Sequence, residues 1–171
     1  MRRRDFLFSG GALAGLAAFG LPLGLPAPAR GQSGVAVRFP FQMSEAAWRS
    51  RLSPEAFAVL RQQATERPYT SPLNEEKRDG VFHCAGCSNA LYSSEAKYDS
   101  RTGWPSFWAP IDEDAVGTKV DRVLLYSRTE VHCARCGGHL GHIFDDGPEP
   151  TGKRHCINGV ALAFRPESVS G

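Results

Sequence analysis

Apolar residues follow a helical spacing near the start of the body of the chain and form short strand-like runs later. In the stretch SPEAFAVLRQQA, Phe57, Leu60 and Ala64 recur at the spacing of one helix face. Ser44 and Ser53 stand where helix N-caps belong, and a proline directly follows the second serine. The pattern therefore predicts two short helices, which end before the helix-breaking stretch ERPYTSPLN.

From Val81 onwards the apolar runs are short and are separated by glycine, aspartate and proline. The runs VLLY, EVHC, HLGHIF and VALAF have the length of strands, and the last alternates with a period of two. The chain contains 18 glycines and 12 prolines, which favour a fold of strands and turns over a helical bundle. We therefore predict short N-terminal helices followed by an antiparallel β domain, so that the fold class is mainly β.

The first 29 residues have the three-part layout of an export signal. A basic start precedes a weakly apolar run of glycine, alanine and leucine, and Ala27-Pro28-Ala29 offers small residues for cleavage. The segment Arg3-Arg4-Asp5-Phe6-Leu7 resembles the twin-arginine motif, whose pathway exports folded proteins. The alternative is an uncleaved membrane anchor, but glycine and proline make this run a poor spanning helix. We expect cleavage after Ala29 and a periplasmic location.

The rest of the chain is long enough for one domain with a buried core. Residues 30–43 are predicted to be a linker, and residues 44–168 the domain. The chain has 20 basic and 18 acidic side chains, and much of its net charge of +2 lies in the first four residues. This balance excludes the basic surface that is typical of nucleic-acid-binding proteins. We also expect no stable membrane association and a monomer.

Four of the five cysteines occur as two matching CxxC pairs, CAGC and CARC. Each pair can direct two thiolates at one ion, so together they can supply four sulfur ligands to a structural zinc. Two disulfides are an alternative in an oxidising compartment. A redox-active CxxC is a third, although that motif normally opens a helix beside a βαβ pattern. The preferred interpretation is a structural Zn²⁺ site, whose four ligands are Cys84, Cys87, Cys133 and Cys136.

The fifth cysteine, Cys156, has no partner left in the sequence. It could be a buried and inert thiol, which is common for cysteine. Arg154 and His155, however, would place positive charge beside it and favour the thiolate. In a strand, Arg154, Cys156 and Asn158 would share one face. An exported protein also exposes any free thiol to oxidants, and we therefore predict that Cys156 is a nucleophile.

Candidate partners for Cys156 precede it in GGHLGHIFDDGPEPTGKRHC. His139 and His142 are three residues apart in a strand-like run, and Asp146 follows at a turn. Histidines in this arrangement can bind metal, but the four cysteines already supply the zinc ligands, so core or surface histidines are the stronger alternative. Trp104 lies in the rigid loop TGWPSFW, which suits the wall of a small apolar pocket, although a tryptophan is more often part of a core.

Taken together, these motifs resemble the B-type peptide methionine-R-sulfoxide reductases. The resemblance spans residues 44–168 and rests on LSPEAFAVLRQQATERPYTSPL, CAGC, YDSRTGWPSF and VHCARCGGHLGHIFDDGPEPTGKRHCINGVAL, in this order. It implies a mainly β fold of two antiparallel sheets, a β-tent, with zinc at the end away from the active site. It also implies reduction of methionine-R-sulfoxide in oxidised proteins and peptides, through a sulfenic acid on the catalytic cysteine.

The resemblance also implies a role for each site residue. Cys156 would be the nucleophile, and His142 and Asn158 would assist around it. Asp146 and Arg154 would order this network. The substrate would be bound by two further residues: Trp104 would hold its methyl group, while His139 would line the pocket.

One position departs from many members of the family, which carry a second, resolving cysteine where this chain has Thr102. We therefore expect a thioredoxin-like protein or a small thiol to reduce the sulfenic acid directly. Two other classes of function remain open from the residues alone. A zinc-ribbon binding module would not need Cys156, and a thiol-disulfide oxidoreductase would use its CxxC thiols in place of zinc binding.

Overall fold

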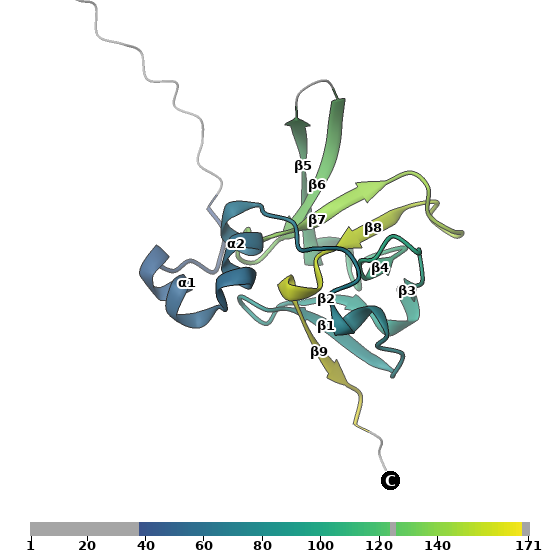
Figure 1. Ribbon diagram of the computed structural model, residues 1–171, viewed down its shortest axis with the longest axis horizontal. Coiled ribbons are helices and arrows are strands. Elements are labelled where there is room, and N and C mark those ends of the chain that lie inside the picture. Colours follow the sequence, from purple (N-terminus) through teal and green to yellow (C-terminus); the bar gives the residue numbers. More distant parts are fainter. Residues whose placement is uncertain (1–37, 124–125, 169–171) are drawn as a thin grey trace, which may run out of the picture. The chain divides into compact units, whose positions relative to one another are not determined.

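The structure is a computed structural model that describes residues 38–123 and 126–168 (Figure 1). The predicted export signal lies outside the described residues. Within the described part of the chain, no helix has both the length and the apolar character needed to cross a membrane.

Two short helices open the domain, as predicted. Helix α1 spans Glu45–Arg51 and helix α2 spans Pro54–Gln62. The hydroxyl groups of Ser44 and Ser53 accept hydrogen bonds from backbone N–H groups in the first turn of each helix, as N-caps do. Helix α2 buries its apolar face, which includes Phe57 and Leu60. The predicted caps are therefore confirmed.

The strands form two antiparallel sheets, as predicted. One sheet has three strands in the order β2-β1-β9, and the other has six in the order β3-β4-β8-β7-β6-β5. In Figure 1, the hairpin of β5 and β6 projects beyond its neighbouring strands. The strands are β1 (Gly80–Cys84), β2 (Ala90–Ser93), β3 (Lys97–Tyr98), β4 (Ser106–Phe107), β5 (Val116–Val123), β6 (Tyr126–Cys133), β7 (His139–Phe144), β8 (Arg154–Ile157) and β9 (Leu162–Pro166).

Two of the predicted strand runs need correction. The run VLLY is not one strand, because Val123 at the end of β5 pairs with Tyr126 at the start of β6. The run therefore contains the paired ends of two antiparallel strands, and apolar character alone did not reveal this pairing. The first two residues of VALAF belong to a short 3₁₀ helix, η4 (Gly159–Ala161), and β9 begins only at Leu162. The runs EVHC and HLGHIF lie in β6 and β7 as predicted.

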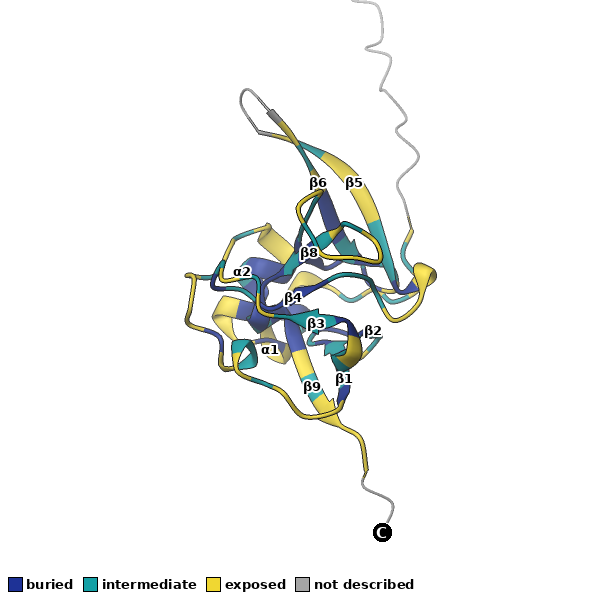
Figure 2. Cartoon of the chain, turned by 90° about the vertical axis from the view of Figure 1, so that its right-hand side faces the viewer, coloured by how far each residue is buried: buried dark blue, intermediate teal, exposed yellow. Residues whose placement is uncertain are grey.

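The core lies between the two sheets and is closed by the helices. Phe82 of β1 meets Phe107 of β4 edge to face, with ring centroids 5.0 Å apart, and Tyr92 of β2 stacks on Phe107 at 4.3 Å. These three rings are fully buried. Figure 2 shows the buried segments gathered at the centre of the domain, with exposed residues along β5 and the end of β9. The aromatic contacts thus join the three-stranded sheet to the six-stranded sheet.

The last residues of the predicted linker pack against the domain. The backbone N–H of Phe41 donates to the carbonyl of Arg135 at 2.9 Å, and Phe41 and Met43 contact the buried core. The ring of Phe39 meets the ring of His132 edge to face. Packed structure therefore begins before Ser44.

His155 couples the stability of the core to pH. It is buried on β8, and its Nδ1 atom lies 3.1 Å from the hydroxyl of Tyr92. Burial, with a smaller contribution from the charge of Lys153, lowers the pKa of His155 from 6.5 to about 4. The imidazole is therefore neutral in the folded chain at pH values where the unfolded chain already binds a proton.

We expect this histidine to lower the free energy of unfolding by about 1 kcal/mol between pH values of about 7.5 and 5.5. The loss begins as the pH falls through the unfolded pKa and continues towards the folded one. Urea unfolding of the wild type and of His155→Gln at several pH values gives the free energy of unfolding as a function of pH, with metal content followed at each pH. The contribution of His155 is the difference between the slopes of these two curves. Equal slopes for the two proteins would contradict the expectation.

Candidate active site

Cys156 lies in the middle of a row of polar residues that crosses the six-stranded sheet. It is paired with Ser106 of β4 on one side and with His142 of β7 on the other. Because side chains alternate along a strand, Arg154 shares the face of Cys156, while His155 points to the opposite, buried face. The row across the strands, in order, is Tyr98, Ser106, Cys156, His142, Glu130 and Lys119.

A hollow of about 150 Å³ opens above Cys156. Its wall is mostly apolar, with a few polar groups, which is typical of a small-molecule site. Trp104, His142 and Asn158 of the predicted site line it together with Cys156. The remaining lining residues are Thr65, Arg128, Gly141 and Phe144. The structure therefore brings four of the seven predicted catalytic and substrate-binding residues to one small hollow.

Burial raises the pKa of the Cys156 thiol above its usual value. The charge of Arg154 acts in the opposite direction, as does the hydroxyl of Thr102, whose Oγ1 atom lies 4.0 Å from the sulfur. From the sequence we predicted that His155 would also place positive charge beside Cys156. That expectation was wrong, because His155 is on the other face and its lowered pKa leaves it neutral. The resting cysteine is therefore a thiol.

Glu66 holds both Asn158 and Trp104 in place. Its backbone N–H donates to Oδ1 of Asn158 at 2.9 Å, and its carbonyl accepts from Nε1 of Trp104 at 3.1 Å. Its carboxylate accepts hydrogen bonds from the backbone N–H groups of Gly159 and Val160. The amide Nδ2 of Asn158 donates to the carbonyl of Leu140 at 2.8 Å. Asn158 is thus a buried link between the loop before β1 and the strand of His142.

His142 contacts a carboxylate, that of Asp121, which was not predicted from the sequence. Its Nε2 atom lies 2.9 Å from Oδ2 of Asp121 on β5. The same oxygen accepts a hydrogen bond from Nη2 of Arg128 at 2.8 Å. These hydrogen bonds, that from His142 above all, lower the pKa of Asp121.

His139 lies behind this pair and does not line the hollow. It is almost fully buried, and its ring meets that of His142 edge to face, with centroids 5.4 Å apart. Its Nδ1 atom is 3.1 Å from the buried carboxylate of Glu130, without the geometry of a hydrogen bond. Burial lowers the pKa of His139, although Glu130 opposes this. His139 therefore supports His142 from beneath and is not placed to touch a substrate in the hollow.

Asp146 and Arg154 form an ion pair at the edge of the site. Nε and Nη2 of Arg154 donate to the two carboxylate oxygens of Asp146 at 2.8 and 2.9 Å. Arg154 also stacks on the ring of Phe144, which lines the hollow. Asp146 therefore holds the guanidinium that lies beside Cys156 on the same strand face.

The four remaining cysteines form one buried cluster. Their sulfur atoms all lie within 4.8 Å of one another, and two of the sulfur pairs are 3.6 and 3.7 Å apart. Tetrahedral ligands at a Zn–S distance of about 2.3 Å stand about 3.8 Å apart, so the spacing fits a four-thiolate site. It is far too long for disulfides. Cys84 ends β1 and Cys133 ends β6, so a bound metal ion would join the two sheets.

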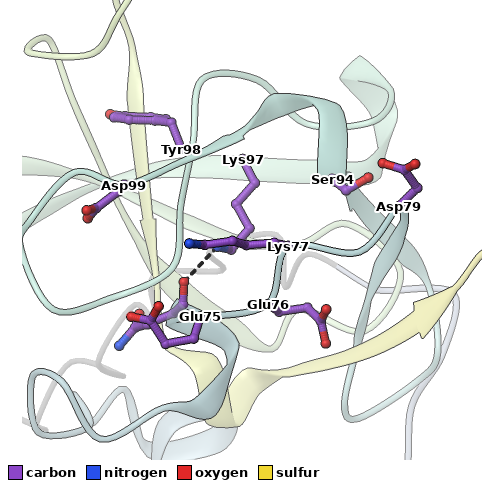
Figure 3. A pocket seen from close by; sticks show the side chains of 9 residues that line it. Glu75, Glu76, Lys77, Asp79, Ser94, Lys97, Tyr98 and Asp99 are labelled. Carbon is purple, nitrogen blue, oxygen red and sulfur yellow. Dashed lines mark hydrogen bonds between the residues drawn. The ribbon is translucent and has the colours of Figure 1, made fainter.

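A larger hollow of about 330 Å³ lies along β3 (Figure 3). Lys97 extends across it and donates from Nζ to the carbonyl of Asn74 at 2.9 Å. Its lining includes no cysteine, histidine or tryptophan. A third hollow, of about 180 Å³, shares Lys97 and Tyr98 with this one and Trp104 with the hollow above Cys156. The indole of Trp104 therefore separates the site from a further recess.

Three residues that shape the site were not predicted from the sequence: Glu66, Asp121 and Arg128. Glu66 lies in ERPYTSPLN, where the pattern indicated only the end of a helix. Asp121 and Arg128 flank the apolar run VLLY, and their positions follow from the hairpin that the run conceals. Had that run been recognised as a hairpin, their opposite charges would have indicated a cross-strand pair.

Comparison with known proteins assigns the chain to a family. The SelR domain matches residues 52–166. A protein of Methanosarcina mazei is 49% identical over 130 residues, which cover 76% of this chain and 93% of that protein. Proteins of Pseudomonas putida and Bradyrhizobium diazoefficiens are 50% and 52% identical, over 70% and 72% of this chain and 91% and 89% of their own lengths. All three are named peptide methionine sulfoxide reductase MsrB. This chain therefore belongs to the SelR domain family.

Proposed function

We propose that this chain reduces methionine-R-sulfoxide in peptides and proteins to methionine. The observation that carries the proposal is the free thiol of Cys156 in a hollow of side-chain size, between an indole and an imidazole. The names of the similar proteins support the same activity.

The reaction transfers two electrons from Cys156 to the sulfoxide sulfur. The sulfur of Cys156 attacks the sulfoxide sulfur, and a proton delivered to the sulfoxide oxygen makes it a leaving group. With a second proton the oxygen departs as water. A solvent water molecule then attacks the sulfur of Cys156, releases methionine and gives back one proton. In balance, the methionine sulfur gains two electrons, Cys156 loses two, and the products are methionine and a cysteine sulfenic acid.

The buried thiol can itself supply a proton that this step needs. Because the resting Cys156 is protonated, it becomes a strong nucleophile only when a base removes its proton. His142 lies opposite it on the neighbouring strand and lines the same hollow. In our proposal His142 moves this proton to the sulfoxide oxygen, while Arg154 stabilises the thiolate. Asn158, held by Glu66, fixes the wall beside them.

The hollow can distinguish the two epimers of the sulfoxide, because its walls differ. A methyl group fits against the indole of Trp104, the oxygen lies towards His142, and the side chain enters from the mouth. The sulfoxide sulfur carries three different groups. Only one epimer meets these requirements while leaving its sulfur open to attack by Cys156. The resemblance of the sequence supports the R epimer.

The recesses beyond Trp104 favour substrates that are part of a polypeptide. The hollow above Cys156 has room for the methionine side chain, and the hollow on the far side of the indole adds about 180 Å³. Tyr69 lines that second hollow and is 71% exposed, so an aromatic surface is available next to Trp104. In a polypeptide, the residues that flank the oxidised methionine could contact this surface. Free methionine sulfoxide has no such residues and could not bind there.

We infer that the sulfenic acid is reduced directly, by a thioredoxin-like protein or by a small thiol. Thr102 faces Cys156 at the position where a resolving cysteine would stand, and a hydroxyl cannot form a disulfide. The other four cysteines belong to the buried cluster, for which we propose a structural zinc ion. With four sulfur ligands such an ion would have no open position for the substrate.

We further propose that the protein acts in the periplasm after export by the twin-arginine route. The basic start and apolar run of the first 29 residues support this. Export in the folded state would allow the four thiols to receive metal in the reducing cytoplasm. Fractionation of cells that produce the full chain tests the location, and an exclusively cytoplasmic protein would contradict it.

A single-turnover experiment tests the activity and its chemistry together. The protein, without any reductant, is given one equivalent of the R or the S epimer of a methionine sulfoxide peptide. We expect the R peptide alone to be reduced, with the mass of one oxygen atom added to the protein at Cys156. A protein that loses two hydrogens has instead formed a disulfide, which would contradict direct reduction. No reduction of either peptide by a metal-loaded protein would favour a zinc-ribbon binding module.

A further inference from the structure

The contact between His142 and Asp121 joins the site to the projecting hairpin of β5 and β6. His142 lies on β7 and Asp121 on β5, with β6 between them. The side chains of both residues are largely buried, at 13% and 22% exposure. The Nε2–Oδ2 distance of 2.9 Å is that of a full hydrogen bond. The hairpin thus reaches across one strand to hold the imidazole that lines the hollow.

Arg128 helps to keep the carboxylate of Asp121 ionised and directed at His142. It is the cross-strand partner of Asp121, and its Nη2 atom donates to the same oxygen, Oδ2. Together the two donors hold Asp121 ionised, since they lower the pKa of its carboxyl group. Arg128 also lines the hollow. The carboxylate is therefore restrained by one charged neighbour and directed at one imidazole nitrogen.

An ionised carboxylate can only accept hydrogen bonds, and this fixes the hydrogen on the imidazole. Nε2 of His142 must be the protonated nitrogen whenever the contact is made. Nδ1 is then the acceptor of the neutral ring and the second donor of the charged ring. A histidine that takes a proton from a thiol and gives it to an oxygen needs one nitrogen that stays free for both steps.

We propose that Asp121 is a positioning residue that holds His142 in its Nε2–H tautomer, so that Nδ1 is the nitrogen that exchanges the catalytic proton. This inference rests on the proposed function. The charged groups around the pair are compatible with it. Glu130 and Lys119 pair with each other, and Glu130 lies against His139, so neither competes for Nε2 of His142.

The direct test is the tautomer of His142 in the wild-type protein. In ¹⁵N NMR spectra the protonated and the unprotonated nitrogen of a neutral imidazole differ strongly in chemical shift. We expect the assigned His142 ring to show a protonated Nε2 and an unprotonated Nδ1. The opposite tautomer would overturn the proposal without the need for any variant, and the result does not depend on turnover.

The second test is the substitution Asp121→Asn, which keeps the shape but can offer either an oxygen or an N–H to Nε2. We expect kcat for the R peptide to fall by about tenfold to a hundredfold, with KM changed by less than about twofold. The His142 spectrum should show a mixture of tautomers. Asp121→Glu keeps the carboxylate and should restore the tautomer and part of kcat. Unchanged kcat and tautomer in Asp121→Asn would overturn the proposal.

A matched control is Glu45→Gln, which removes a carboxylate from an exposed ion pair with Arg49 far from the hollow. It should leave kcat, KM and the His142 spectrum unchanged. If the wild type fails to reduce either sulfoxide, the proposed function is wrong, and the tautomer still decides whether Asp121 positions His142. If Asp121→Asn fails to fold, the tautomer of His142 in the wild type and in Asp121→Glu still tests whether Asp121 positions His142.

Discussion

Replacing Cys156 with serine is expected to abolish turnover of the R sulfoxide peptide, with a loss in kcat of at least about a thousandfold. Cys156 carries the only thiol outside the four-cysteine cluster, and no other described residue that lines the hollow offers a sulfur nucleophile. A serine hydroxyl is a much weaker nucleophile towards sulfur and cannot form a sulfenic acid. The loss should appear with dithiothreitol as reductant, so that the supply of electrons is not limiting.

The same variant also shows whether the cysteines are divided between two tasks. Cys156 lies on β8, whereas the cluster lies at the ends of β1 and β6, so Cys156→Ser should keep the metal content and the thermal midpoint of the wild type. Residual turnover of more than about a tenth of the wild-type rate would place the reacting thiol elsewhere. Loss of metal in this variant would contradict the separation of the two sites.

Features that depend on neighbours in the sequence were predictable, as the helix caps show. Ser44 and Ser53 cap α1 and α2 because a hydroxyl needs only the N–H groups three residues ahead. Within each CxxC pair, the spacing of the two cysteines is enough to bring their thiols close together. Only the approach of one pair to the other depends on the fold. The prediction of two sheets rested on the resemblance and not on the strand pattern.

Features that depend on strand register were not predictable in this way. Asp121 reaches His142 only because β5 and β6 pair in one register, which places Asp121 opposite Arg128. A shift of one residue would turn all these side chains to the other face. The effect of His155 was misjudged for a related reason: proximity to Cys156 in the sequence suggested proximity of charge, whereas alternation along β8 separates the two side chains.

Removal of one cluster cysteine is expected to have the largest effect on stability. In Cys84→Ser, we expect metal binding to be lost and the free energy of unfolding to fall by several kcal/mol, roughly 5 or more. That is comparable to the whole stability of a domain of this size. The cause is the position of the cluster, because Cys84 ends β1 of one sheet and Cys133 ends β6 of the other. Without the metal ion, no ligand bonds join these strand ends, and three buried thiols and a hydroxyl face one another.

Metal analysis and urea unfolding of Cys84→Ser, beside the wild type and Cys156→Ser, measure this effect. A strong chelator added to the wild type should produce the same loss of stability, and added zinc should reverse it only where all four cysteines are present. The two cysteine variants should therefore fail in opposite ways. Cys156→Ser folds with metal and without activity, whereas Cys84→Ser loses activity because the two sheets separate and the domain that positions Cys156 unfolds. A Cys84→Ser protein with wild-type stability would show that the four thiols do not hold the two sheets together.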